Sequence, residues 1–180
     1  IGMTLLLITG EIDLSIGSIA GFSGVAVGMC LDAGMPVFMA IIVGLLSGMI
    51  IGFVNGYLVA KVRINSLIAT LGMQMIIRGL IYVLTKGVGK PSFPDNYNII
   101  GRYMVFGKIQ LPIIISLILV ILFAVLFAKS SWFRQFYFIG GNAESAKYSG
   151  IQVNKLKIVA FTFMGFMSAL SGVLLAARMG

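Results

Sequence analysis

Four long apolar stretches limit what this chain can fold into. They are Pro36–Ala60, Ser66–Thr85, Leu111–Ala128 and Ile158–Ala177. Each is close to the roughly 20 residues that a helix needs to cross the hydrocarbon core of a bilayer. Three contain no charged residue, and the second contains only Arg78. The sequence therefore predicts an all-α fold, a polytopic transmembrane helical bundle in the cell membrane (the inner membrane of a Gram-negative bacterium).

The composition excludes most soluble classes of protein. Hydrophobic residues make up 59% of the 180 positions and charged residues only 10%, whereas about 25% of a soluble domain is charged. The excess of 13 Lys and Arg over 5 Asp and Glu is typical of membrane-protein loops that set orientation and contact anionic head groups. We expect no nucleic-acid partner.

The supply of reactive side chains is also small. With one cysteine, Cys30, and no histidine, the sequence lacks a disulfide framework, thiolate–imidazole metal sites and His-dependent triads. We expect no catalytic residue, no metal and no cofactor bound by this chain.

Residues 1–31 follow a different pattern. Two apolar runs, Ile1–Thr9 and Ile16–Leu31, flank the polar residues 10–15. Together the runs are too long for one straight span and each alone is too short, so we expect a helix broken at 10–15. Irregular backbone at membrane depth requires protein or a water-filled cavity around it. The alternative is a polar loop at the membrane surface between two partial helices.

The distribution of basic residues sets the expected orientation. Lys61 and Arg63 lie in one tight connection, and the 129–157 connection carries five more basic residues. We place both on the cytoplasmic side and 86–110 on the opposite side, so that segment 1–31 runs from inside to outside. Residues 1–180 then form a single, partial transmembrane domain, because both ends adjoin apolar runs and suggest further helices beyond them.

One face of the 36–60 stretch carries a row of glycines. Gly44, Gly48, Gly52 and Gly56 recur every four residues, which aligns them along a helix. Small residues in such a row let a neighbouring backbone approach closely. We expect this face to pack against another helix.

A few polar side chains fall within the apolar segments, where protein or water must surround them. Asp13 could line a cavity or cap the second half-helix. Arg78 could pair with Glu11 or Asp13, or extend toward the membrane surface. Asn55, Thr70 and Gln74 could equally make interhelical hydrogen bonds. The candidate lining of a polar path is Glu11, Asp13, Asn55, Thr70, Gln74 and Arg78.

The 129–157 connection contains a short helical pattern. Asn142 is a good N-cap, Glu144 would lie in the first turn, and Gly150 fits the position after the helix end. The pattern predicts a two-turn helix outside the membrane. A helix this short is unstable alone in water, so it needs a surface, either of a partner protein or of its own bundle.

Four motifs, in order, resemble one family. Residues 140–151, Gly-Gly-Asn-Ala-Glu-Ser-Ala-Lys-Tyr-Ser-Gly-Ile, resemble the cytoplasmic coupling segment of ABC-transporter permeases of the ribose/xylose/autoinducer-2 (simple sugar) importer family. Residues 10–18, Gly-Glu-Ile-Asp-Leu-Ser-Ile-Gly-Ser, resemble that family's signature. Val54–Gly56 and Ile68–Gly72 match further blocks.

The resemblance implies a transport subunit, not an enzyme, that forms the translocation path for a monosaccharide such as ribose. Its partners would be a second permease chain (homo- or heterodimer), cytoplasmic ATPase subunits that bind the ATP, and an extracytoplasmic sugar-binding protein. Glu11, Asp13 and Ser15 would lie near the path. The segment that couples to the ATPase would be shaped by Gly140, Gly141, Asn142, Glu144, Ala146 and Gly150.

An alternative interpretation is an ion-coupled secondary transporter or channel. It would use Glu11, Asp13 and Arg78 as an intramembrane polar relay. The short helix in the 129–157 connection distinguishes the two, because an ion-driven transporter needs no coupling segment. The sequence has no Walker A pattern, so the first interpretation puts ATP hydrolysis on a separate subunit.

Overall fold

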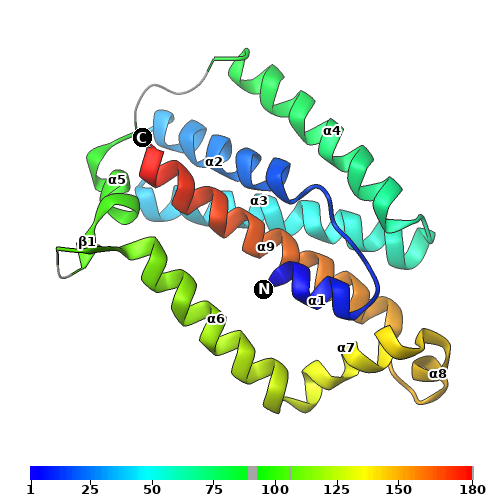
Figure 1. Ribbon diagram of the computed structural model, residues 1–180. Helices are drawn as coiled ribbons and strands as arrows, with labels where there is room; N and C mark the ends of the chain where they lie inside the picture. The colour runs from blue at the N-terminus through cyan, green and yellow to red at the C-terminus, as the bar shows by residue number, and fades with distance from the viewer. Residues whose placement is uncertain (89–92, 106, 180) are drawn as a thin grey trace.

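The computed structural model describes residues 1–88, 93–105 and 107–179. Nearly all of this is helical (Figure 1). In chain order the elements are α1 (Gly2–Ile8), α2 (Ile16–Asp32), α3 (Val37–Tyr57), the π-helical turn η1 (Leu58–Val62), α4 (Ser66–Thr85), α5 (Asp95–Arg102), β1 (Met104–Val105), β2 (Ile109–Gln110), α6 (Leu111–Lys129), α7 (Ser131–Gly141), α8 (Ala143–Tyr148) and α9 (Val153–Met179). β1 and β2 form a small antiparallel hairpin.

Four helices in the described residues are long and apolar enough to cross a bilayer. They are α3 with η1, α4, α6 and α9, which confirms the predicted all-α transmembrane bundle. α9 begins at Val153, before the apolar run that starts at Ile158. Its first turns carry Lys155 and Lys157, whose long side chains can reach the membrane surface while the backbone stays helical.

The centre of the bundle is the crossing of α3 with α9, which the glycine row of α3 makes possible. A Cβ atom built on Gly48 would lie 2.6 Å from the carbonyl oxygen of Gly165, and one on Gly56 would lie 2.8 Å from Cα of Ile158. The expected packing of this glycine face is confirmed. α2 completes the centre, with Gly24 against Ala176 of α9.

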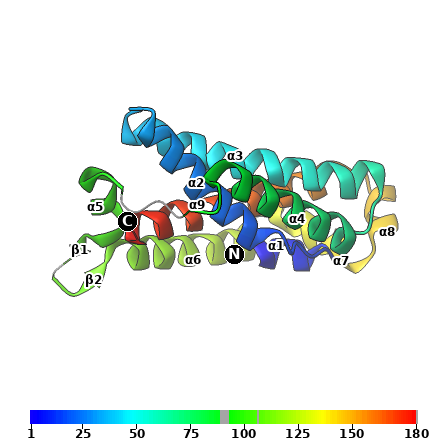
Figure 2. The same ribbon diagram turned by 90° about the horizontal axis from the view of Figure 1, so that it is seen from above.

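The contacts also fix the direction of each helix. Gly44 lies against Val173 and Gly56 against Ile158, so α3 and α9 are antiparallel. The η1–α4 turn, α7 and α8 gather at one end of the bundle, which we call the α8 end (Figure 1). α5, the hairpin and the α2–α3 turn gather at the other end (Figure 2). The two strongly basic connections therefore share one end, as the charge pattern predicts.

The path of residues 1–31 differs from the expected one. Gly2 packs against Met164 in the middle of α9, whereas Ile8 reaches Gly140 at the α8 end. α1 therefore runs toward the α8 end and α2 runs away from it, so the expected single run from inside to outside is wrong for α1. Gly10 has φ +77°, and the left-handed turn there reverses the chain.

The turn at Gly10 closes α1 with two backbone hydrogen bonds. Gly10 N–H donates to the Leu7 carbonyl at 3.0 Å, and Glu11 N–H donates to the Leu6 carbonyl at 3.0 Å. This is the Schellman pattern, which requires a left-handed residue at the first position beyond the helix and favours glycine there. Gly10 is therefore the one residue in the sequence that indicates the reversal of chain direction between α1 and α2.

α5 is attached to α9 at the end of the bundle opposite α8. The Tyr97 side chain is fully buried, and its hydroxyl donates to the Val173 carbonyl at 2.7 Å. Burial raises the pKa of the Tyr97 phenol, because the charged phenolate is disfavoured away from water. The phenol therefore stays protonated and remains a hydrogen-bond donor.

We predict opposite effects of the same substitution at two helical glycines. Gly48→Ala puts a methyl group against the Gly165 carbonyl and should destabilise the fold by about 1–3 kcal/mol, as overpacking does. Gly72→Ala is the matched control. Apart from its own helical turn, no atom of the described residues lies within 4 Å of a Cβ there, and alanine favours a helix by about 0.5–1 kcal/mol over glycine. Thermal unfolding in detergent measures both. Equal melting temperatures for the two variants would contradict the packing described.

Candidate functional site

The polar break between α1 and α2 holds a buried carboxylate. Asp13 is completely buried, and its Oδ1 accepts hydrogen bonds from the Ser15 N–H (2.8 Å) and the Ser15 hydroxyl (2.6 Å). Asn55 of α3 reaches across with its Nδ2, which donates to Ser15 Oγ at 3.0 Å and to Asp13 Oδ2 at 3.4 Å. Asp13 thus supports the start of α2 from two residues before the N-cap, Ser15.

The backbone of the break is satisfied by the first turns of α4. Leu14 N–H donates to Thr70 Oγ1 at 3.1 Å, and the Thr70 hydroxyl donates to the Ser66 carbonyl at 2.7 Å. The Ile12 N–H donates to Ser66 Oγ at 3.5 Å. Thr70 is four residues into α4, about 6 Å along the axis at 1.5 Å per residue. The network therefore lies near the α8 end.

Arg78 does not meet either carboxylate. With the Gln74 amide oriented to satisfy both its neighbours, Gln74 donates to the Leu14 carbonyl at 3.2 Å and accepts from Arg78 at 3.1 Å. Arg78 is exposed, twelve residues into α4, or about 18 Å along its axis. The suggested pairing of Arg78 with Glu11 or Asp13 is therefore wrong, since each carboxylate has other partners.

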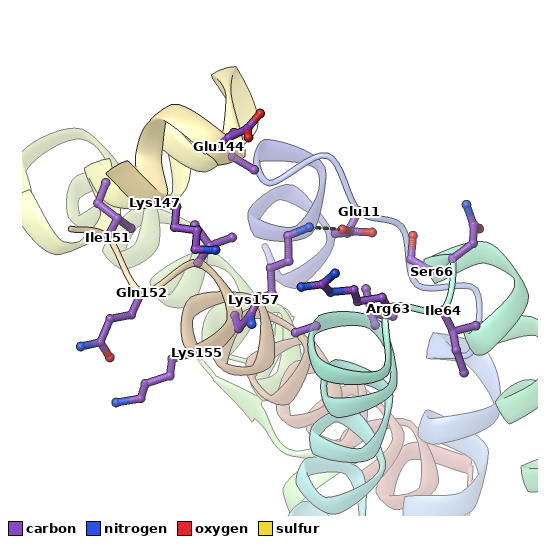
Figure 3. A pocket seen from close by; sticks show the side chains of 16 residues that line it. Glu11, Arg63, Ile64, Ser66, Glu144, Lys147, Ile151, Gln152, Lys155 and Lys157 are labelled. Carbon is purple, nitrogen blue, oxygen red and sulfur yellow. Dashed lines mark hydrogen bonds and ion pairs between the residues drawn. The ribbon is translucent and has the colours of Figure 1, made fainter. Parts of the chain in front are cut away.

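Glu11 makes an ion pair that the sequence did not suggest. Its Oε1 lies 2.5 Å from Nζ of Lys157, in the first turns of α9, and both side chains are mostly buried (Figure 3). The two residues are 146 positions apart, so no local pattern links them. The sequence shows Lys157 only as one of five basic residues in the 129–157 connection.

The short α8 follows α7 and is capped at both ends. Asn142 Oδ1 accepts from the backbone N–H groups of Glu144 (3.0 Å) and Ser145 (2.9 Å). At the other end Gly150, with φ +82°, closes a second Schellman turn. In it the Ile151 N–H donates to the Ala146 carbonyl at 3.1 Å. The helix expected within 129–157 is present, and the roles expected of Asn142 and Gly150 in it are confirmed.

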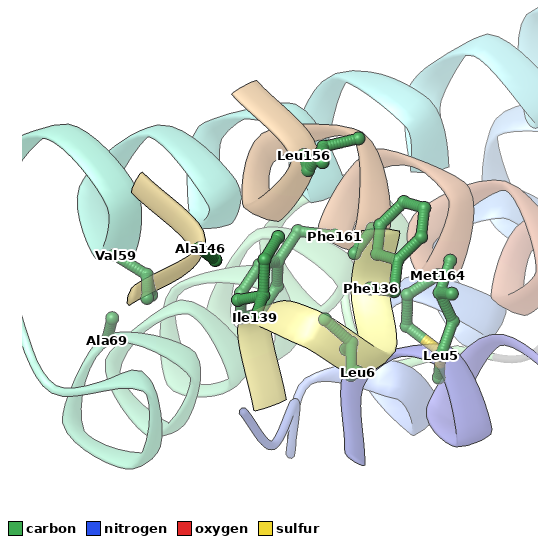
Figure 4. Close-up of a cluster of buried hydrophobic side chains, with 11 residues drawn as sticks. Leu5, Leu6, Val59, Ala69, Phe136, Ile139, Ala146, Leu156, Phe161 and Met164 are labelled. Carbon is green, nitrogen blue, oxygen red and sulfur yellow. The ribbon is translucent and has the colours of Figure 1, made fainter. Parts of the chain in front are cut away.

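α8 has a single anchor in the bundle. Ala146 is the only buried residue of α8 and joins Phe136 and Ile139 of α7 in an apolar cluster (Figure 4). Gly140, at the end of α7, lies directly against the Ile8 carbonyl of α1, where a side chain would not fit. Gly141 has open space around it. The remaining residues of α8, including Glu144, are exposed.

Two buried polar atoms in this region have no hydrogen-bond partner among the described residues. They are Asn55 Oδ1 and Ser18 Oγ. A buried polar atom without a partner costs roughly 1–3 kcal/mol, so a water molecule or a polar ligand would be stabilised beside them. Within the described residues, no group of three His, Cys, Asp or Glu side chains could hold a metal ion.

The structure places most of the candidate residues near the break, but in separate groups and not as one continuous series of interacting charges. Asp13, Ser15 and Asn55 form one group, and Thr70 and Gln74 bind the backbone of the break beside it. Glu11 belongs with Lys157, and Arg78 with Gln74.

Comparison with known proteins identifies the family. The family model described as "Branched-chain amino acid transport system / permease component" matches residues 1–180. No solved structure matches the chain.

Relatives with curated names extend this match. The autoinducer 2 import system permease protein LsrC of Yersinia enterocolitica is 36% identical over the whole chain and 50% of its own length. LsrC of Escherichia coli strain SMS-3-5 is 36% identical over 99% of the chain and 52% of its own length. The L-arabinose transport system permease protein AraH of E. coli K12 is 35% identical over 99% of the chain and 54% of its own length.

The chain spans about half the length of these relatives. The match runs through both the polar break and the α8 segment, the two places where the sequence motifs resemble permeases of simple-sugar importers. The chain is therefore a multi-pass membrane protein that belongs to this family of transport-system permease components.

Proposed function

We propose that this chain is the transmembrane subunit of an ATP-driven sugar importer and that α8 is the segment through which an ATPase subunit acts on it. The observation that carries the proposal is the form of α8. A six-residue helix has both ends capped and one buried anchor, Ala146, while Tyr148 is 83% exposed. Such a rigid, exposed projection suits a groove on a partner protein better than a role in the bundle.

The connections of α8 support a route for coupling. α8 leads through residues 149–152 directly into α9, where Lys157 pairs with Glu11. Glu11 begins the stretch that carries Asp13 and Ser15 and ends at α2. A displacement of α8 by the partner would therefore reach the polar break through this ion pair, in addition to the contact of Gly140 with Ile8 of α1.

The polar groups beside the break suit the lining of a sugar path. An exposed arginine in the middle of a span costs about 2.5–3.5 kcal/mol if it faces lipid. Arg78 should therefore face water or a second permease chain, and the same face of α4 carries Gln74. The amide of Gln74 and the guanidinium of Arg78 match the acceptors and donors of sugar hydroxyls, whereas Asn55 and Thr70 are fully buried in the hydrogen-bond network of the break.

The substrate class follows from these groups and from the relatives. The relatives are named for autoinducer 2 and L-arabinose, although the family description names branched-chain amino acids. An amino acid would need a free carboxylate or cation for each of its charges. Asp13 and Glu11 are already engaged, which favours a small neutral sugar such as ribose or arabinose.

The importer would require partners. Two permease chains, ATPase subunits that hold the ATP, and an extracytoplasmic sugar-binding protein complete the assembly in this proposal. The ion-coupled alternative has no support from the geometry, because Glu11, Asp13 and Arg78 each pair with a different residue instead of forming a relay.

Reversing one exposed charge on α8 tests the coupling role. We predict that Glu144→Arg lowers ATP-driven sugar uptake by more than about tenfold, as expected for a charge lost from a docked interface, while the amount of folded protein is unchanged. Uptake and ATP hydrolysis in proteoliposomes measure this. Lys129→Glu, an exposed charge reversal at the end of α6, is the control. Equal uptake by Glu144→Arg and wild type would refute the role of α8.

A charge swap tests the route from α8 to the break. We predict that Glu11→Lys and Lys157→Glu each reduce uptake at least about tenfold, because each leaves like charges in a mostly buried contact. The double variant, which restores opposite charges, should recover uptake to within about threefold of wild type, as coupled neighbours do.

The control for the swap is Lys155→Glu. Lys155 is exposed and lies two residues before Lys157 in the first turn of α9. This substitution should leave uptake unchanged. A double variant no more active than either single variant would show that the ion pair does not carry the coupling.

A further inference from the structure

The function proposed above uses Glu144, Glu11 and Lys157 at the α8 end but assigns no ligand to the groove that these residues line. This groove encloses about 810 Å³ between α8, the first turn of α9 and the η1–α4 turn (Figure 3). Its walls are partly apolar, from Val59, Ile64, Ile151 and Val153, and partly charged. Many of the side chains around it are exposed, so the groove is open to the surroundings.

Basic side chains dominate the charged part of the groove. Arg63, Lys147, Lys155 and Lys157 line it, against two acidic residues, Glu11 and Glu144. Glu11 is engaged by Lys157. Within the residues that the structure describes, no carboxylate lies within ion-pair distance of Arg63, Lys147 or Lys155. The groove therefore has an excess of unpaired positive charge.

The backbone presents Arg63 in an unusual way. η1 is a π-helical turn, and Arg63 directly after it has φ +64°, the left-handed conformation that a non-glycine residue rarely adopts. Ile64 N–H closes the turn by donating to the Leu58 carbonyl at 3.1 Å. Figure 3 shows the guanidinium directed toward the space beside the Lys157–Glu11 pair. Strained backbone of this kind recurs at ligand-binding positions.

The ends of the apolar spans indicate the depth of the groove. It is lined by the last residues of the α3–η1 span and the first residues of the α4 and α9 spans, and span ends are expected at the level of the lipid head groups. Guanidinium groups bind phosphate through paired hydrogen bonds, and ammonium groups add charge. The apolar wall would accept the glycerol and first methylene groups of a lipid.

We propose that this groove binds the phosphate head group of an anionic phospholipid, with Arg63 and Lys147 as its main ligands. Basic pockets between transmembrane helices on the cytoplasmic side are suited to such lipids. The bound lipid would connect the η1–α4 turn with α8. This site is independent of whether α8 couples to an ATPase.

The test measures lipid binding to the purified full-length protein in neutral detergent. Titration with phosphatidylglycerol should raise the melting temperature in a saturable way, and phosphatidylcholine should not. The double variant Arg63→Gln/Lys147→Gln should weaken the apparent affinity for phosphatidylglycerol about 25-fold, at about fivefold for each basic residue. Native mass spectrometry counts the bound lipid.

The matched control removes the same charge at the same end. Lys61→Gln/Lys129→Gln changes two exposed basic residues that do not line the groove, and it should keep wild-type affinity. An equal loss in this control would assign lipid binding to diffuse surface charge and overturn the proposal. Lys147→Glu alone, at an exposed position, serves as a second variant if replacement of Arg63 prevents folding.

Two further outcomes would also overturn the proposal. Inorganic phosphate at millimolar concentration should compete only weakly. Full stabilisation by phosphate without lipid would identify a free anion as the ligand. Wild-type affinity for phosphatidylglycerol in Arg63→Gln/Lys147→Gln, together with loss of a co-purifying protein subunit, would assign the groove to a protein partner.

Discussion

The contact between the backbones of α3 and α9 is the constraint on which the rest of the structure depends. In a bilayer, helices gain nothing from burying apolar surface against each other, so close packing must hold them together. Gly48 and Gly52 of α3 and Gly165 of α9 lie so close that none could carry a side chain without a shift. This crossing fixes α9, and α9 in turn positions Lys157 and the start of the α8 connection.

Two similar turns place the polar parts of the protein on that frame. Gly10 ends α1 and Gly150 follows α8, each in a left-handed conformation with the same pair of hydrogen bonds. The first turn sends the chain from the α8 end back into the bundle, where its free backbone groups meet Thr70 and Gln74 of α4. The second turn leads from α8 into α9. The Lys157–Glu11 pair joins the two regions.

Much of this could be predicted from local sequence patterns. The spans follow from the length and apolarity of their runs, the glycine face from a four-residue period, and α8 from Asn142 and Gly150 as caps. The contact of Arg78 with Gln74 is a local one between residues four apart on α4. The partner of Glu11, by contrast, could not be predicted, because it depends on how α1 is folded back. That reversal rests on one left-handed residue, Gly10, and the same glycine is compatible with a simple break between two aligned half-helices.

The central claim is that α8 is the surface on which an ATP-hydrolysing subunit acts. The most direct measurement is a photo-crosslink from position 148, where the Tyr148 side chain is almost fully exposed, in the full-length protein within its native membrane. The account predicts that the main protein crosslinked is an ATPase subunit, and that the crosslink yield changes when ATP is added. Crosslinks only to lipid, or to proteins that do not hydrolyse ATP, would contradict the claim.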